Sequence, residues 1–200
     1  MRRALTFAVL PAAAAAFAWL LAGAGAQHYS SPIELALSPD DTRLYVVCEG
    51  SDELAVVDVE SGKVLRRVPV GHTPKGLALS PDAKFVYVAN SWSDTVTEID
   101  AQTLAVARTL HAGFEPTGVL VDREGKTLYA ANRIGGDISV IDLASGGEPR
   151  RLLAGRGASY LAGSPDGRFI YGTHIYPNPG SYRAPPQSEI SVIDTGRQAV

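Results

Sequence analysis

The sequence predicts an all-β protein built from repeated four-stranded antiparallel sheets, which is the arrangement of a β-propeller. A tyrosine recurs at a constant interval of 42 residues, at Tyr45, Tyr87, Tyr129 and Tyr171. Matching segments precede these tyrosines and begin near residues 31, 73, 115 and 157. No repeat contains a helical period of any length. Because one such unit cannot bury its apolar face alone, neighbouring units must stack, and four strands in about 40 residues make one propeller blade.

The second repeat shows the expected strands in chain order. Gly76 to Ser80 is apolar and leads into a turn, and Phe85 to Asn90 alternates apolar and aromatic side chains. A turn at 91–94 separates this strand from Thr95 to Asp100, and Leu104 to Leu110 forms the last strand. In the fourth repeat only six residues follow Asp194, where the last strand should begin. We therefore expect about four blades, the last of them incomplete.

Recurring turn residues have a structural explanation. Ser-Pro-Asp stands at three equivalent places, residues 38–40, 80–82 and 164–166, and suits type I turns, in which the Ser or Asp side chain bonds back to the backbone. An aspartate also ends the third strand of each repeat, at Asp58, Asp100, Asp142 and Asp194. Because turn chemistry accounts for every copy, we interpret these acids as structural and expect no metal ligands among them.

The N-terminus has the pattern of a secretory signal peptide at residues 1–26. Arg2 and Arg3 precede an uncharged stretch from Ala4 to Ala26 that ends in Ala-Gly-Ala. The stretch is also long enough to span a bilayer, so an uncleaved anchor is the alternative. Small residues at its end favour cleavage, which predicts an extracytoplasmic protein, periplasmic or secreted, with no membrane segment after cleavage and propeller repeats over 27–200.

Composition narrows the possible partners. Without Arg2 and Arg3 the 18 basic residues fall to 16 against 21 acidic residues, a net charge of −5. Such an acidic domain is not expected to bind nucleic acid, because that binding gains from basic surfaces through counterion release. The single cysteine, Cys48, cannot form an intramolecular disulfide, and its place at the end of an apolar strand predicts a buried, inert thiol.

Several motifs together resemble a known family. Tyr87-Val-Ala-Asn90 and Tyr129-Ala-Ala-Asn132, with Leu-Ser-Pro-Asp before the first and Val-Ile-Asp after the second, resemble the YVTN-type, YncE-like β-propeller repeats of secreted and cell-surface proteins. The resemblance covers residues 31–200. It implies a ring of about seven blades, so the chain is expected to be an N-terminal fragment of a longer member. Family members include surface-layer proteins, periplasmic binding proteins, lactonase-like propellers and propellers fused to c-type cytochrome domains.

Candidate binding residues lie on one face of the predicted propeller. The loops between the second and third strands share a face with the connections between blades, and rigid scaffolds commonly present ligand contacts on such loops. The fourth repeat carries a ten-residue insertion here, rich in proline, since Tyr171 to Asp194 is 23 residues whereas Tyr129 to Asp142 is 13. The candidate ligand-binding or partner-binding residues are Trp92, Arg133, His174, Tyr176, Tyr182 and Arg183.

His174 replaces the asparagine of the second and third repeats, and histidine is a common ligand of metals and haem. No partner at a metal-ligand spacing accompanies it, and no motif for a catalytic nucleophile, phosphate loop or haem attachment is present. No catalytic residue, metal site or cofactor is therefore expected, and haem is expected only if a downstream domain exists.

Three functions remain open. The leading hypothesis is a secreted, non-catalytic β-propeller that binds a protein partner or a small ligand through its loop-rich face. The second is the propeller part of a larger c-type cytochrome or peroxidase-like redox protein, in which the insertion would contact a missing C-terminal domain. The third is a lactonase-like hydrolase.

Overall fold

A computed structural model describes residues 30–176, 189–197 and 199–200. Within these ranges the chain forms fifteen β-strands and two short 3-10 helices. The described residues contain no helix that is long and apolar enough to cross a membrane. The signal-peptide prediction for residues 1–26 lies outside the described residues.

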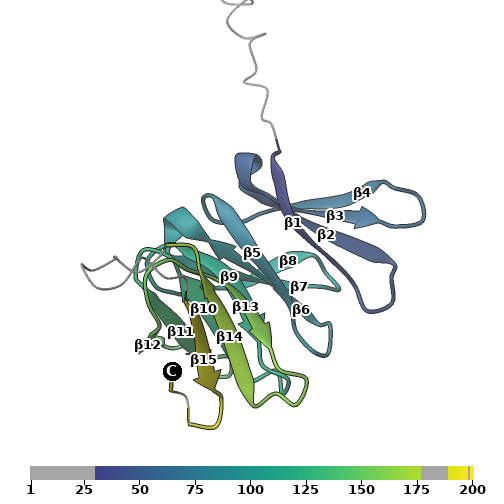
Figure 1. The fold of residues 1–200 in the computed structure, drawn as a ribbon. Coiled ribbons are helices and arrows are strands. Elements are labelled where there is room, and N and C mark those ends of the chain that lie inside the picture. The colour runs from purple at the N-terminus through teal and green to yellow at the C-terminus, as the bar shows by residue number, and fades with distance from the viewer. Residues whose placement is uncertain (1–29, 177–188, 198) are drawn as a thin grey trace, which may run out of the picture.

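The strands group into consecutive antiparallel sheets that follow one another in an arc (Figure 1). The first blade contains β1 (Pro32–Leu37), β2 (Arg43–Cys48), β3 (Glu53–Asp58) and β4 (Val64–Pro69), with the helix η1 (Glu49–Ser51). The second contains β5 (Pro74–Leu79), β6 (Phe85–Asn90), β7 (Thr95–Asp100) and β8 (Ala105–His111), with η2 (Ser91–Ser93).

The third blade contains β9 (Pro116–Val121), β10 (Thr127–Asn132), β11 (Asp137–Asp142) and β12 (Arg150–Leu153). The fourth contains β13 (Ala158–Gly163), β14 (Phe169–His174) and β15 (Ile190–Asp194). Three sheets of four strands and one of three, within the described residues, confirm the predicted all-β propeller architecture with an incomplete last blade. In the second blade β6 and β7 have the predicted bounds, whereas β5 starts two residues early, at Pro74, and β8 starts at Ala105 because Leu104 turns with φ of 55°.

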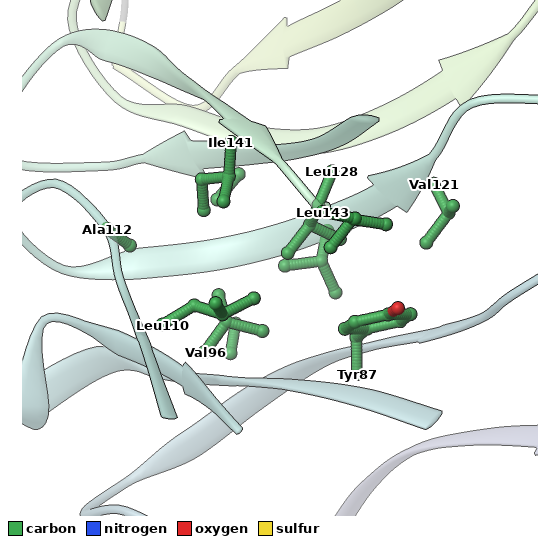
Figure 2. Packing of buried hydrophobic residues seen from close by; sticks show 11 residues of the cluster. Tyr87, Val96, Leu110, Ala112, Val121, Leu128, Ile141 and Leu143 are labelled. Atoms are coloured by element: carbon green, nitrogen blue, oxygen red, sulfur yellow. The ribbon is translucent and has the colours of Figure 1, made fainter. Parts of the chain in front are cut away.

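Apolar side chains fill the space between neighbouring blades. Figure 2 shows Val96 and Leu110 of the second blade facing Leu128 and Ile141 of the third, and all four are at most 2% exposed. Tyr87 closes the same cluster. A blade between two others buries both faces of its sheet. Successive side chains along its strands therefore point alternately to the two neighbouring blades. This stacking is the core that a single repeat cannot supply.

The inner strands of the second, third and fourth blades pack with almost no space between them. A Cβ atom added to Gly76 would lie 2.4 Å from the backbone oxygen of Thr117, and one added to Gly118 would lie 2.2 Å from that of Ser159. Real Cβ atoms do not approach this closely, so a larger residue at either position would force the neighbouring strands apart. At the equivalent positions the first blade has Glu34 and the fourth has Tyr160.

Candidate functional site

Each inner strand contains a β-bulge at the same place. The pairing of β1 with β2 shifts between Pro32 and Glu34, and the pairing of β9 with β10 shifts beside Asn132. Strands β5 and β13 shift at the equivalent points. The side chains at the bulges are Ile33, Lys75, Thr117 and Ser159, which are spaced 42 residues apart. Bulges change the direction of side chains and are common beside functional sites. The four equivalent bulges therefore point to the loop-rich end of the inner strands as a candidate site.

The bulge side chains meet at a hollow of about 370 Å³. We call it the inner-strand pocket. It is lined by Ile33, Glu34, Lys75, Thr117, Arg133, Ser159, Tyr160 and Ile175. All four blades contribute, because β1, β5, β9 and β13 each supply at least one side chain. Its size falls at the lower end of the range for small-molecule sites.

The basic side chains of the pocket are already neutralised. Lys75 Nζ lies 2.6 Å from Glu49 Oε1. The Arg133 guanidinium makes a two-pronged contact with the Glu115 carboxylate, through Nε to Oε2 at 2.9 Å and through a second, shorter bond. The hydrogen bonds to Glu115 raise the pKa of Arg133 above its ordinary value. Bidentate pairs fix the orientation of both side chains, so Arg133 forms a rigid rim.

The backbone at the third and fourth blades is tied by a buried hydroxyl. Thr117 Oγ1 donates to the Ser159 carbonyl oxygen at 3.1 Å, with the Ala131 and Ala158 carbonyl oxygens each 3.4 Å away. The bond links β9 to β13 at the bottom of the pocket. A pocket with a preformed floor loses less entropy on binding than one that must be ordered.

Glu34 is the unusual group in the pocket. Burial raises the pKa of its carboxyl to about 6, against a smaller opposing effect of a hydrogen bond from the Leu77 backbone. Within the part of the chain that the structure describes, no salt bridge involves Glu34. A half-buried carboxylate without a cationic partner is costly, and such groups concentrate at functional sites.

Large apolar side chains stand exposed on the same face. Trp92 is 74% exposed and Ile134 is 65% exposed, and with Tyr176 they occupy one equivalent position in three successive blades. Phe114, on the connection into the third blade, is 64% exposed. Gathered apolar and aromatic residues on a loop surface are typical of interaction sites.

The structure separates the residues predicted for binding. Arg133 lies at the pocket, Tyr176 contacts Gly157 beside it, and Trp92 stands on the exposed surface of the same face. Tyr182 and Arg183 lie outside the described residues. The binding roles assigned to all of these residues remain predictions.

His174 occupies a different environment from the others. It is 8% exposed, its Nε2 lies 2.9 Å from Ser191 Oγ, and its Nδ1 lies 3.3 Å from the Arg156 carbonyl oxygen. It takes the place of Asn90 and Asn132 inside the blade. Within the described residues, no group of three or more His, Cys, Asp or Glu side chains could hold a metal ion.

Sequence reasoning missed Glu34, the key acidic group of the pocket. The available signal was a departure from the repeat, because Glu34 stands where the second and third repeats have Gly76 and Gly118. Strand topology places Lys75 and Tyr160 on this face, but only the bulges bring their side chains together.

The opposite face carries the repeated turns, and its hydrogen bonds confirm their structural interpretation. Ser80 Oγ donates to Asp82 Oδ1 at 2.7 Å and accepts the Phe85 N–H at 2.9 Å. Asp100 Oδ1 accepts the Thr103 N–H at 2.7 Å. Hollows of about 450 and 440 Å³ lie between blades here, but they are grooves beside these turns, whose carboxylates are bonded within the scaffold.

Comparisons with known proteins agree with this architecture. A family model described as YNCE-like beta-propeller matches residues 7–135. Comparison with curated protein sequences finds no match. Among solved structures, a chain of Kuenenia stuttgartiensis hydrazine synthase is similar, with a TM-score of 0.77, 25% identity and coverage of 88% of this chain. The aligned part is 50% of that chain, so the present chain spans about half the length of this structural relative.

Proposed function

Because the model of the YncE-like β-propeller family matches more than half of its length, the chain belongs to that family, and we propose that it is an extracytoplasmic, non-catalytic binding protein. Its loop-rich face takes up a small ligand or a protein partner. The observation that carries this proposal is the inner-strand pocket, where a bulge in each of four inner strands aims side chains into one hollow.

The state of the pocket's polar groups supports binding. Arg133 is held in place by Glu115, and Thr117 is held by the Ser159 carbonyl, so the walls are ordered before a ligand arrives. Glu34 remains available as an uncompensated charge. Preorganised walls with few, well-placed polar groups are the usual composition of a small-molecule site.

A protein partner would be held by the apolar residues around the pocket. Trp92, Phe114 and Ile134 add exposed apolar area on the same face, and aromatic anchors commonly dominate interface energetics. Tyr176 belongs to the same surface, and Tyr182 and Arg183 follow it in the sequence.

Affinity capture tests the binding face. The tagged full chain is incubated with the extracytoplasmic fraction of its source, and bound proteins and small molecules are identified by mass spectrometry. The triple variant W92A/F114A/I134A should lose captured proteins while its thermal unfolding stays unchanged, because the three side chains are already exposed. The matched control is Val106→Ala, an exposed apolar residue on the outer strand β8. Capture that survives the triple variant contradicts protein binding through this face.

The expected location has its own test. N-terminal sequencing of the protein purified from the extracytoplasmic fraction should begin at Gln27, after the Ala-Gly-Ala sequence. A protein that retains Met1 would instead support the uncleaved anchor.

A second candidate is a non-catalytic domain within a larger enzyme. The similarity to half of a hydrazine synthase chain favours it, because that propeller belongs to a protein named as an enzyme. This is the propeller part of the larger c-type cytochrome or peroxidase-like protein considered above. A Cys-x-x-Cys-His motif in the coding sequence after Val200 would favour this candidate, and haem would then be the associated cofactor.

A further inference from the structure

We propose that the inner-strand pocket binds a small organic cation, with an ammonium group against the Glu34 carboxylate and an apolar body against Tyr160 and Ile33. The inference rests on the proposed function, since it names the ligand class for the same face.

The charges of the pocket favour a cation. Lys75 and Arg133 are each matched by a carboxylate, from Glu49 and Glu115, so these pairs leave no net charge. Glu34 adds one further negative charge. A cationic ligand would neutralise it, whereas an anion would meet Glu34 without gaining a free basic partner.

The walls of the pocket match an organic cation better than a bare metal ion. Glu34 is one carboxylate in a wall that also contains the apolar side chains of Ile33 and Ile175. Tyr160, an aromatic residue that is 64% exposed, lines the same hollow. An aromatic ring attracts an ammonium group through its quadrupole, and the apolar walls bury carbon.

The position of Glu34 favours a role in ligand binding over a role in stabilising the fold. Burial raises the pKa of the Glu34 carboxyl to about 6, so the ionised side chain is unfavourable in this environment. The equivalent residues Gly76 and Gly118 show that the fold does not need an acid there. A charge that costs stability and lines a pocket is expected where a ligand compensates it.

The test uses three probes of similar shape and different charge. Benzylammonium, benzyl alcohol and benzoate are titrated at pH 7.5 into the ¹⁵N-labelled full chain, without its signal segment if the mature protein lacks it. Amide chemical shifts are followed by NMR at Thr117, Ser159 and Tyr160. We expect saturable shifts with benzylammonium, weaker shifts with benzyl alcohol and none with benzoate.

Two substitutions assign the contacts. Glu34→Gln should weaken benzylammonium binding by about tenfold or more, because the ion pair with the ammonium group becomes a neutral contact, and should weaken benzyl alcohol binding much less. Tyr160→Ala should weaken benzylammonium binding by about two- to fivefold through the lost ring contact. Glu60→Gln, an exposed glutamate on the turn between β3 and β4 at the opposite end of its blade, is the matched control and should bind as the wild type does.

The outcomes separate the ligand class from the pocket itself. If benzyl alcohol or benzoate binds at these amides as tightly as benzylammonium, the cation inference is wrong and small-ligand binding in the pocket stands. Unchanged benzylammonium binding by Glu34→Gln also overturns the inference. If no probe gives saturable shifts at these amides at its highest soluble concentration, both the inference and small-ligand binding at this pocket fail.

Discussion

Asn132 holds the chain that enters its own blade, because its Oδ1 accepts the Gly113 N–H at 3.0 Å. Its Nδ2 donates to Ser139 Oγ at 2.9 Å, so one fully buried amide joins the incoming connection to two strands of the blade. Asn90 makes the equivalent bond to the Gly71 N–H, also at 3.0 Å. These bonds give a structural role to the asparagine that ends the Tyr87-Val-Ala-Asn90 and Tyr129-Ala-Ala-Asn132 motifs.

Asn132→Ala should destabilise the protein by about 1–3 kcal/mol, because a buried N–H and a buried hydroxyl lose their partner. Urea unfolding followed by circular dichroism measures the loss. Gln102→Ala, on an exposed turn, is the control and should change the free energy of unfolding little. A loss for Asn132→Ala as small as that of the control would contradict a structural role for the amide.

His174→Asn should leave the free energy of unfolding nearly unchanged, since asparagine fills this position in the two preceding blades and Ser191 keeps a partner. His174→Ala should be destabilising by about 1–3 kcal/mol for the reason given for Asn132. Both variants are compared by urea unfolding. If His174→Asn is as destabilised as His174→Ala, the histidine does more than replace the asparagine.

Gly118→Ala should destabilise the protein by about 1–3 kcal/mol, because the new methyl group would push β9 away from the Ser159 backbone. Gly163→Ala is the matched control on β13, where the nearest atom to an added Cβ is Leu120 Cδ2 at 3.6 Å, an ordinary contact. Thermal unfolding of the two variants should therefore differ clearly. Equal stability would mean that the inner strands separate without cost.

Acid should weaken the turns on the opposite face. Hydrogen bonds from Ser80 and Lys84 lower the pKa of Asp82 from 3.8 to about 2. Because the native carboxyl binds its proton less tightly than the unfolded one, its stabilising effect is present above pH 3.8 and disappears as the pH falls toward 2. The melting temperature of Asp82→Asn should fall less steeply than that of the wild type over this range. A slope equal to that of the wild type would contradict the assignment.

Glu34→Gln should stabilise the protein at pH 7. The native pKa of about 6 lies above the ordinary 4.5, so the stability contributed by the protonated form is present below 4.5 and is lost as the pH rises through 6. The gain at pH 7 is about 1 kcal/mol after allowance for solvent screening of a partly exposed group. The other titratable groups around Glu34 are the same in the variant and the wild type. They are Lys75, Arg133 and Tyr160, which line the pocket, and Glu49 and Glu115, which pair with the two cations. If Glu34→Gln and the wild type had the same free energy of unfolding at both pH 5 and pH 7, this prediction would be contradicted.

The blade architecture could be predicted from the sequence because it depends on local chemistry that repeats. The alternation in Phe85 to Asn90 and the turn chemistry of Asp82 and Asp100 act within a few residues. The strands can therefore be predicted from each repeat separately. Departures such as Leu104, whose positive φ moves the start of β8 to Ala105, depend on the exact turn and shift a strand end by one residue.

The pocket could not be predicted in the same way, because it depends on contacts between blades. Glu34, Thr117 and Tyr160 are far apart in the chain, and only the stacking of β1, β9 and β13 with their bulges brings them to one hollow. The sequence shows that Glu34 departs from the glycine of its repeat, but it does not show what the carboxylate faces.

By itself, therefore, the 42-residue period determined the strands and turns of this protein, since these arise from short-range patterns that recur in each repeat. The resemblance of the repeated motifs indicated the family. Tertiary structure alone decided that His174 lies inside a blade and that Glu34 lies in a pocket beside paired cations. The physical reason is that burial and charge pairing depend on contacts between neighbouring blades. The sequence of a single repeat specifies only one side of each such contact.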